Sequence, residues 1–123
     1  MTTLDEYQLA ALRTVPELEP AQLVQNMALG LAGETGEVIE RVKKQVYHGH
    51  TPDVGGLVGE LGDVLWYLAG LCSAYGLTLS DVANANIAKL QARYPDGFSA
   101  ERSINRDEEL DLEYTWLNQA GSL

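Results

Sequence analysis

Apolar residues recur every three or four positions along most of the chain, which is the spacing of amphipathic helices. Segments rich in proline, glycine and histidine interrupt this pattern and mark turns. The pattern predicts helices over residues 4–13, about 21–47, about 52–75 and 81–93, with 106–118 as a candidate for a fifth. Thr51 is expected to cap the third helix, because Pro52 suits a first helical turn.

Strand character is confined to residues 45–47 and 77–79, which are too short to build a sheet. The sequence therefore predicts an all-α fold, an antiparallel bundle of four to five helices, in a single domain over residues 1–123. The short turn at residues 48–52 favours antiparallel packing of the two long helices.

The chain carries 8 Lys and Arg against 18 Asp and Glu, a formal net charge of -10. Such acidity disfavours nucleic acid and anionic membranes as partners, because Lys and Arg supply most phosphate affinity. Glu60 and Asp63 interrupt the apolar stretch Leu57–Leu71, so no membrane-spanning segment is expected. The N-terminus lacks the pattern of a signal peptide, and a single cysteine, Cys72, excludes an internal disulfide. We therefore expect a cytoplasmic protein.

Two acidic pairs are the strongest candidates for chemistry: Glu34 with Glu37 in the second helix, and Glu60 with Asp63 in the third. Positions i and i+3 share a helix face, so each pair projects two carboxylates in one direction. Both pairs lie at similar distances from the turn and should therefore stand level. Converging carboxylates are costly unless a hard divalent cation neutralises them, and Mg²⁺ is usual where phosphate oxygens complete its shell.

Each acidic pair taken alone is also typical of a solvated helix face. Glu60 and Asp63, however, lie at the edge of the apolar stripe of their helix and not opposite it, which favours the mouth of a cleft. Seven glycines within the two helices lie close to the acids. They indicate close approach of either a ligand or a neighbouring helix.

Asn86, Lys89 and Arg93 form one polar stripe on the fourth helix, at spacings i, i+3 and i+7. In a chain with only eight basic residues this stripe is a candidate site for phosphate, and a solvated stripe is the alternative. Tyr67 follows Asp63 by one helical turn. Its ring could stack on a base, although most aromatics at such positions are packing residues.

Three segments carry these candidates: QNMALGLAGETGEVIERVKK from residue 25, GELGDVLWYLAGL from residue 59 and NIAKLQARYPDGFS from residue 86. Together they closely resemble the MazG-like nucleotide pyrophosphohydrolases, members of the all-α NTP pyrophosphatase superfamily. A paired E-x-x-E and E-x-x-D is the metal signature of that family. The resemblance covers about residues 21–106, so the short N-terminal helix and the C-terminal tail are additions to this core.

The resemblance implies hydrolysis of a nucleoside triphosphate, often a deoxynucleotide, to the monophosphate and pyrophosphate by attack of metal-activated water on the α-phosphorus. Mg²⁺, or alternatively Mn²⁺, would be held by the four acids Glu34, Glu37, Glu60 and Asp63. Some relatives carry a further acid where this chain has Thr35. The water-activating base is therefore unassigned, with Glu34 and Glu37 as candidates.

The resemblance also implies how the substrate would be held and how the chain would assemble. The predicted phosphate contacts are Asn86, Lys89 and Arg93, and the predicted base or sugar contacts are Gln22, Asn26 and Tyr67. Members of the family form dimers or tetramers of helical bundles. A homodimer or homotetramer is therefore expected, which would also bury the two long glycine-rich helices.

Two other classes of function fit parts of the sequence. A non-catalytic helical interaction module would use the acids only for solubility and would gain no stability from Mg²⁺. A di-iron carboxylate bundle requires Glu-x-x-His pairs, and neither His48 nor His50 follows a glutamate by three positions. The di-iron class is therefore the weakest of the three.

Overall fold

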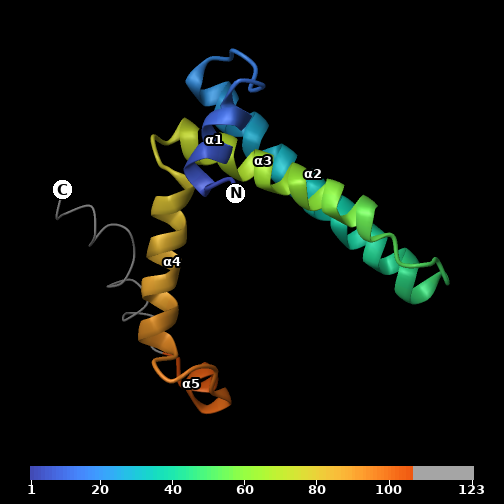
Figure 1. Ribbon diagram of the computed structural model, residues 1–123, viewed down its shortest axis with the longest axis vertical. Helices are drawn as coiled ribbons and strands as arrows, with labels where there is room; N and C mark the ends of the chain where they lie inside the picture. The colour runs from blue at the N-terminus through green and yellow to red at the C-terminus, as the bar shows by residue number, and fades with distance from the viewer. Residues whose placement is uncertain (107–123) are drawn as a thin grey trace. The chain divides into compact units, whose positions relative to one another are not determined.

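A computed structural model describes residues 1–106 and shows helices throughout, without a strand in that range (Figure 1). The helices are α1 (Leu4–Leu12), α2 (Pro20–Tyr47), α3 (Val54–Ala74), α4 (Leu79–Arg93) and α5 (Ala100–Ile104). The all-α prediction is thus confirmed for the described residues. The described residues divide after Leu79 into two units, one over residues 1–79 and one that begins at residue 80.

Capping interactions set the helix boundaries and correct one prediction. The hydroxyl of Thr3 accepts a hydrogen bond from the Glu6 amide at 3.2 Å, and the Glu6 carboxylate accepts one from the Thr3 amide at 2.8 Å. This capping box starts α1. The α3 cap is Asp53, whose Oδ1 accepts from the Gly56 amide at 2.9 Å, and Thr51 is not the cap. The carboxylate satisfies an amide that the helix itself leaves unpaired.

The far end of the chain differs from the predicted helices in two respects. The fourth helix begins at Leu79, two residues earlier than predicted. The short helix α5 was not predicted, and it starts where the Ser99 hydroxyl accepts from the Arg102 amide at 3.3 Å. Apart from Arg106, the predicted helix over 106–118 lies outside the described residues.

The helices α2 and α3 run side by side as an antiparallel hairpin, joined by the short turn that the sequence predicted (Figure 1). Two of their glycines make this approach possible. A Cβ atom at Gly30 would overlap the ring of Tyr67, and one at Gly70 would overlap the side chain of Met27. Met27 is fully buried. Tight helix packing therefore explains these two glycines.

The first helix packs on the C-terminal half of α3 through a buried glutamine. The Gln8 amide donates to Ser73 Oγ at 2.8 Å and to the Leu77 carbonyl at 3.0 Å. Its Oε1 accepts from the Leu79 amide at 2.6 Å. Trp66 Nε1 adds a hydrogen bond to Thr14 Oγ1 at 2.7 Å. Because every polar atom of Gln8 is paired, its burial carries little desolvation penalty.

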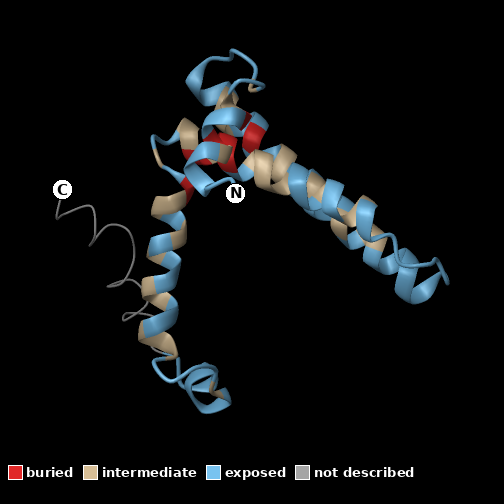
Figure 2. Cartoon of the chain, in the orientation of Figure 1, coloured by how far each residue is buried: buried red, intermediate tan, exposed pale blue. Residues whose placement is uncertain are grey.

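The core of the described residues is small and lies where α1 meets α3 (Figure 2). The buried hydrophobic residues are Ala11, Met27, Ala69, Cys72 and Leu79. Many larger apolar side chains on the hairpin remain exposed, among them Leu29, Ile39, Val46, Val54, Val58 and Leu61. These side chains leave apolar surface of the hairpin open to solvent.

Within the described residues, α3 is the one helix long and apolar enough to cross a membrane by length and composition. The core helix of a folded domain meets the same criterion. Here α3 packs against α1 and α2, and it carries Glu60 and Asp63 near its middle. Its composition is therefore weak support for a membrane span.

Replacement of Gly70 by alanine should destabilise the protein, because the new methyl group would overlap the fully buried Met27. We expect a loss of about 1–3 kcal/mol in the free energy of unfolding, the usual cost of overpacking. Chemical denaturation measures it, with Gly59→Ala as the matched control in the same helix. A Cβ at Gly59 meets no atom within 4 Å, so that variant should be neutral or more stable. Equal stability of the two variants would contradict the packing argument.

Candidate metal centre

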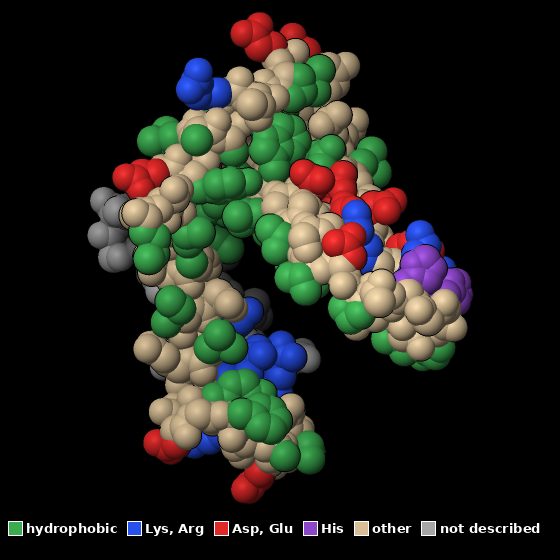
Figure 3. Space-filling view, turned by 45° about the vertical axis from the view of Figure 1, so that its right-hand side comes forward, with side chains coloured by type: hydrophobic (Ala, Val, Ile, Leu, Met, Phe, Trp, Pro, Cys, Tyr) green, Lys and Arg blue, Asp and Glu red, His purple; other side chains and the backbone are tan. Residues whose placement is uncertain are grey.

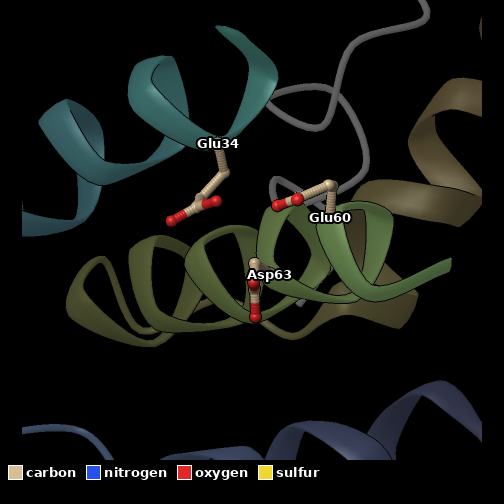
Figure 4. A group of neighbouring side chains, drawn as sticks. All are labelled: Glu34, Glu60 and Asp63. Atoms are coloured by element: carbon tan, nitrogen blue, oxygen red, sulfur yellow. The ribbon is translucent and has the colours of Figure 1, made fainter. Parts of the chain in front are cut away.

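Three carboxylates from two helices converge beside the hairpin seam. Glu34 projects from α2 toward α3, where Glu60 and Asp63 stand one turn apart (Figure 4). One oxygen from each residue lies within 4.8 Å of the others. We call these three residues the acidic trio. Their convergence follows from the i, i+3 spacing on α3 and from the antiparallel pairing that brings Glu34 to the same level.

The acidic trio lies at the border between the packed seam and solvent. The Glu60 side chain is only 16% exposed, Glu34 is half-buried and Asp63 is exposed. The pKa of Glu34 is raised because partial burial disfavours its ionised form and because Asp63, Glu60 and Glu37 repel its charge. A group of like charges held this way favours binding of a cation.

Glu37, predicted to join the same cluster, lies outside the acidic trio. It is one turn nearer the hairpin turn, is exposed, and lines a pocket of about 300 Å³ that Glu60 also borders. The structure thus brings three of the four predicted carboxylates together, and a part for Glu37 beside them stays a prediction. The one-turn rise along α2 carries Glu37 past the level at which Glu34 meets α3.

Arg41 is the residue that sequence reasoning missed. Its Nε donates to Glu60 Oε1 at 2.8 Å, and its Nη2 lies 2.6 Å from the same oxygen. Its Nη1 donates to Asp53 Oδ2 at 3.0 Å. Arg41 follows Glu34 by seven positions on α2, so both residues share a helix face, and that spacing could have placed it beside the acids.

Charged residues of both signs gather on this part of the hairpin, next to the two histidines of its turn (Figure 3). Lys43 and Lys44 both pair with Glu40, at 2.6 and 3.6 Å, so these lysines neutralise a different acid. Within the described residues, Arg41 is the cation that forms an ion pair with the acidic trio. One arginine against three carboxylates leaves the trio with a net negative charge.

The predicted base and sugar contacts lie along α2 and α3. Gln22 and Asn26 are exposed on the N-terminal half of α2. The Tyr67 ring lies against Gly30 and makes an edge contact with Trp66, with ring centroids 4.9 Å apart at 89°. Tyr67 therefore packs within the hairpin, and contact with a base stays a prediction for all three residues.

The predicted phosphate contacts Asn86, Lys89 and Arg93 lie on α4, in the second unit of the chain. Their spacing within this continuous helix gives them a common face. Asn86 is exposed, and Lys89 and Arg93 are half-buried. Their part in binding stays a prediction.

The donor set of the acidic trio suits a hard divalent cation. Carboxylate oxygens are the ligands that Mg²⁺ and Mn²⁺ prefer, and no soft thiolate takes part. A cation would remove the mutual repulsion that raises the pKa of Glu34. The residues present therefore fit a magnesium-type centre.

In metal-free buffer, Glu34→Gln should raise the melting temperature near pH 7. The folded wild type holds a proton on Glu34 to higher pH than the unfolded chain, so ionisation destabilises the fold as pH rises above the ordinary carboxyl pKa. The variant lacks this penalty. Its melting temperature should therefore exceed that of the wild type only slightly near pH 4, and by more as the pH approaches neutrality. Thermal melts in EDTA test this, with Glu17→Gln as an exposed control. A variant no more stable than wild type near pH 7 would contradict the repulsion.

Comparison with known proteins places these residues in a family. The family model for the MazG nucleotide pyrophosphohydrolase domain matches residues 22–98, which include the acidic trio and the polar stripe of α4. The chain is also 32% identical over 117 residues to the "Gene 37 protein" of Mycobacterium phage L5, covering 84% of this chain and 98% of the relative. No solved structure gives a significant match. The chain therefore belongs to the MazG nucleotide pyrophosphohydrolase family.

Proposed function

We propose that the protein is a Mg²⁺-dependent nucleoside triphosphate pyrophosphohydrolase, which converts an NTP or dNTP to the monophosphate and pyrophosphate. One observation supports this above all others. In a chain of the MazG family, three carboxylates from two helices place their oxygens within 4.8 Å of one another. We further propose a cytoplasmic location, where nucleoside triphosphates are found.

In this proposal Glu34, Glu60 and Asp63 hold the ion, and Glu37 stands beside them in its exposed position on α2. When bound, Mg²⁺, or Mn²⁺ in its place, neutralises phosphate charge and lowers the pKa of a water ligand. The protein supplies the carboxylates, and the packing of α2 against α3 sets their spacing before any ligand binds. Such preorganisation is the main means by which active sites stabilise developing charge.

The base that accepts a proton from the attacking water is Glu37 in this proposal, with Glu34 as the alternative. Glu37 lies outside the acidic trio and is exposed, so its carboxylate is free to accept a proton while the trio holds the ion. Water then attacks the α-phosphorus, and pyrophosphate leaves.

The remaining predicted residues would hold the substrate. Lys89 and Arg93, with Asn86, supply charged and amide donors for the triphosphate. Gln22 and Asn26 offer amide groups to the base and sugar on the same helix as Glu34. Tyr67, which packs against Gly30, would contact the nucleoside with the part of its ring that remains exposed.

Pyrophosphate release from the common NTPs and dNTPs in the presence of Mg²⁺ tests the proposal. Glu37→Gln and Asp63→Asn should each lower kcat/KM by at least about 100-fold, because the first removes the proposed base and the second a proposed metal ligand. Helical content by circular dichroism should stay at the wild-type level in both. Glu17→Gln, which removes an exposed acid elsewhere, is the matched control. Unchanged turnover in either variant would overturn the assignment.

The alternative is a non-catalytic interaction module whose acids serve only solubility. The acidic trio argues against it, because solvated acids gain nothing from convergence and repel one another at this distance. A module of that kind would show no rise in melting temperature with Mg²⁺ and nucleotide.

We also propose that a second copy of the chain covers the exposed apolar surface of the hairpin, giving a homodimer or homotetramer. The described residues bury few hydrophobic side chains, all but Met27 in one cluster at the α1–α3 end. Val58 and Leu61 on α3 are 63% and 49% exposed. A self-complementary contact between copies would cover this surface.

The double variant Val58→Asp, Leu61→Asp should reduce the molar mass measured by size-exclusion chromatography with light scattering. Two buried aspartates would face an apolar partner surface without compensation. Leu9→Asp, which introduces a charge at an exposed apolar position on α1, is the control and should keep the wild-type mass. A monomeric wild type, or a variant with wild-type mass, would contradict this interface.

A further inference from the structure

Arg41 touches the acidic trio at one member only. Two of its nitrogens, Nε and Nη2, approach the same oxygen, Oε1 of Glu60. The Glu60 side chain is mostly buried, at 16% exposed, whereas Arg41 is 38% exposed. The guanidinium therefore holds the mostly buried carboxylate of Glu60 from the solvent side.

Arg41 is itself held on its other edge by Asp53. Nη1 donates to Asp53 Oδ2 at 3.0 Å, while Asp53 Oδ1 accepts from the Gly56 amide and caps α3. The chain of contacts thus runs from the backbone at the start of α3, through two side chains, to Glu60. An arginine anchored at both edges loses less freedom when it orients a carboxylate than one anchored at a single edge.

Gly56 provides the space for this arrangement. A Cβ atom at position 56 would overlap the Arg41 guanidinium and the Asp53 carboxylate. The neighbouring Gly55 has no such constraint, because its Cβ would lie 3.8 Å from Asp53 Oδ1, an ordinary contact. A side chain at position 56 would therefore overlap the arginine, whereas one at position 55 would not.

We propose that Arg41 is a positioning residue for the metal centre, which holds Glu60 by Oε1 so that its other oxygen can bind the divalent cation. The inference rests on the proposed function. It assigns Arg41, Asp53 and Gly56 to one supporting unit, although none of them binds the metal or the substrate. Residues that orient a metal ligand typically contribute 10–100-fold to metal affinity.

The positive charge of Arg41 would change the affinity for the cation in the opposite direction. Arg41 carries a positive charge close to the cation site, and its removal would strengthen cation binding if charge alone mattered. If orientation of Glu60 dominates, removal weakens binding instead. The direction of the change in metal affinity therefore separates positioning from simple charge compensation.

Titration of the metal-free, full-length protein with Mn²⁺, with free Mn²⁺ counted by electron paramagnetic resonance, tests this directly. We expect Arg41→Gln to raise the Kd for Mn²⁺ by about 10–100-fold. Arg41→Lys, which keeps the charge without the planar fork, should raise it by a smaller factor. Lys43→Gln removes a charge from the same stretch of α2 without contact to Glu60, and it should leave the Kd within about twofold of wild type.

Gly56→Ala provides an independent test, because it displaces the guanidinium while every charged residue stays in place. Its Kd should rise in the direction of Arg41→Gln, and Gly55→Ala, its matched control, should bind as wild type does. Helical content by circular dichroism checks the fold of each variant. An unchanged or lower Kd in Arg41→Gln, or equal Kd values for the two glycine variants, would overturn the positioning role alone. Failure of the wild type to bind Mn²⁺ would overturn the proposed metal centre and this inference together.

Discussion

Electrostatic repulsion among the carboxylates of Glu34, Glu60 and Asp63 is the constraint to which the rest of the hairpin is adapted. Three acids with oxygens within 4.8 Å of one another oppose the packing of the helices that carry them. Their position at the edge of the seam keeps part of their hydration, and Arg41 compensates the mostly buried Glu60. The repulsion that remains would be relieved by a bound cation.

Close helix packing is what holds these acids at one level. The contacts of Gly30 with Tyr67 and of Gly70 with Met27 bring the backbones of α2 and α3 together, in the half of the hairpin away from its turn. The capped start of α3 holds the other half, where Asp53 meets both the Gly56 amide and Arg41. The acidic trio lies between these two fixed regions. Its geometry therefore depends on packing on both sides and not on the acids themselves.

Helical periodicity was enough to predict the all-α class and the antiparallel hairpin, because the apolar spacing and the short turn are local properties. The i, i+3 spacing likewise predicted that Glu60 and Asp63 share a face. The sequence does not state how far one helix slides along its neighbour, and that offset decides whether Glu37 stands level with the other three acids. That offset depends on side-chain packing, such as the fit of Met27 against Gly70.

Arg41 shows a different limit of reading a sequence. Its ion pairs join residues 12 and 19 positions apart, and an arginine in a run of charged residues is usually a solvated one. The reason for a glycine at position 56 is likewise not visible in the sequence. A larger residue there would overlap side chains that come from another helix and from the turn. Local patterns singled out the acids that are candidates to hold a metal, whereas the contacts of Arg41 and Gly56 are visible only in the tertiary structure.

The proposed activity depends on a divalent cation bound among Glu34, Glu60 and Asp63. Diffraction from crystals soaked in Mn²⁺, collected for the anomalous signal of manganese, would locate that cation. An anomalous peak is expected within coordination distance of oxygens from all three residues, about 2.0–2.3 Å. A peak elsewhere on the molecule, or none among these carboxylates at saturating Mn²⁺, would contradict it.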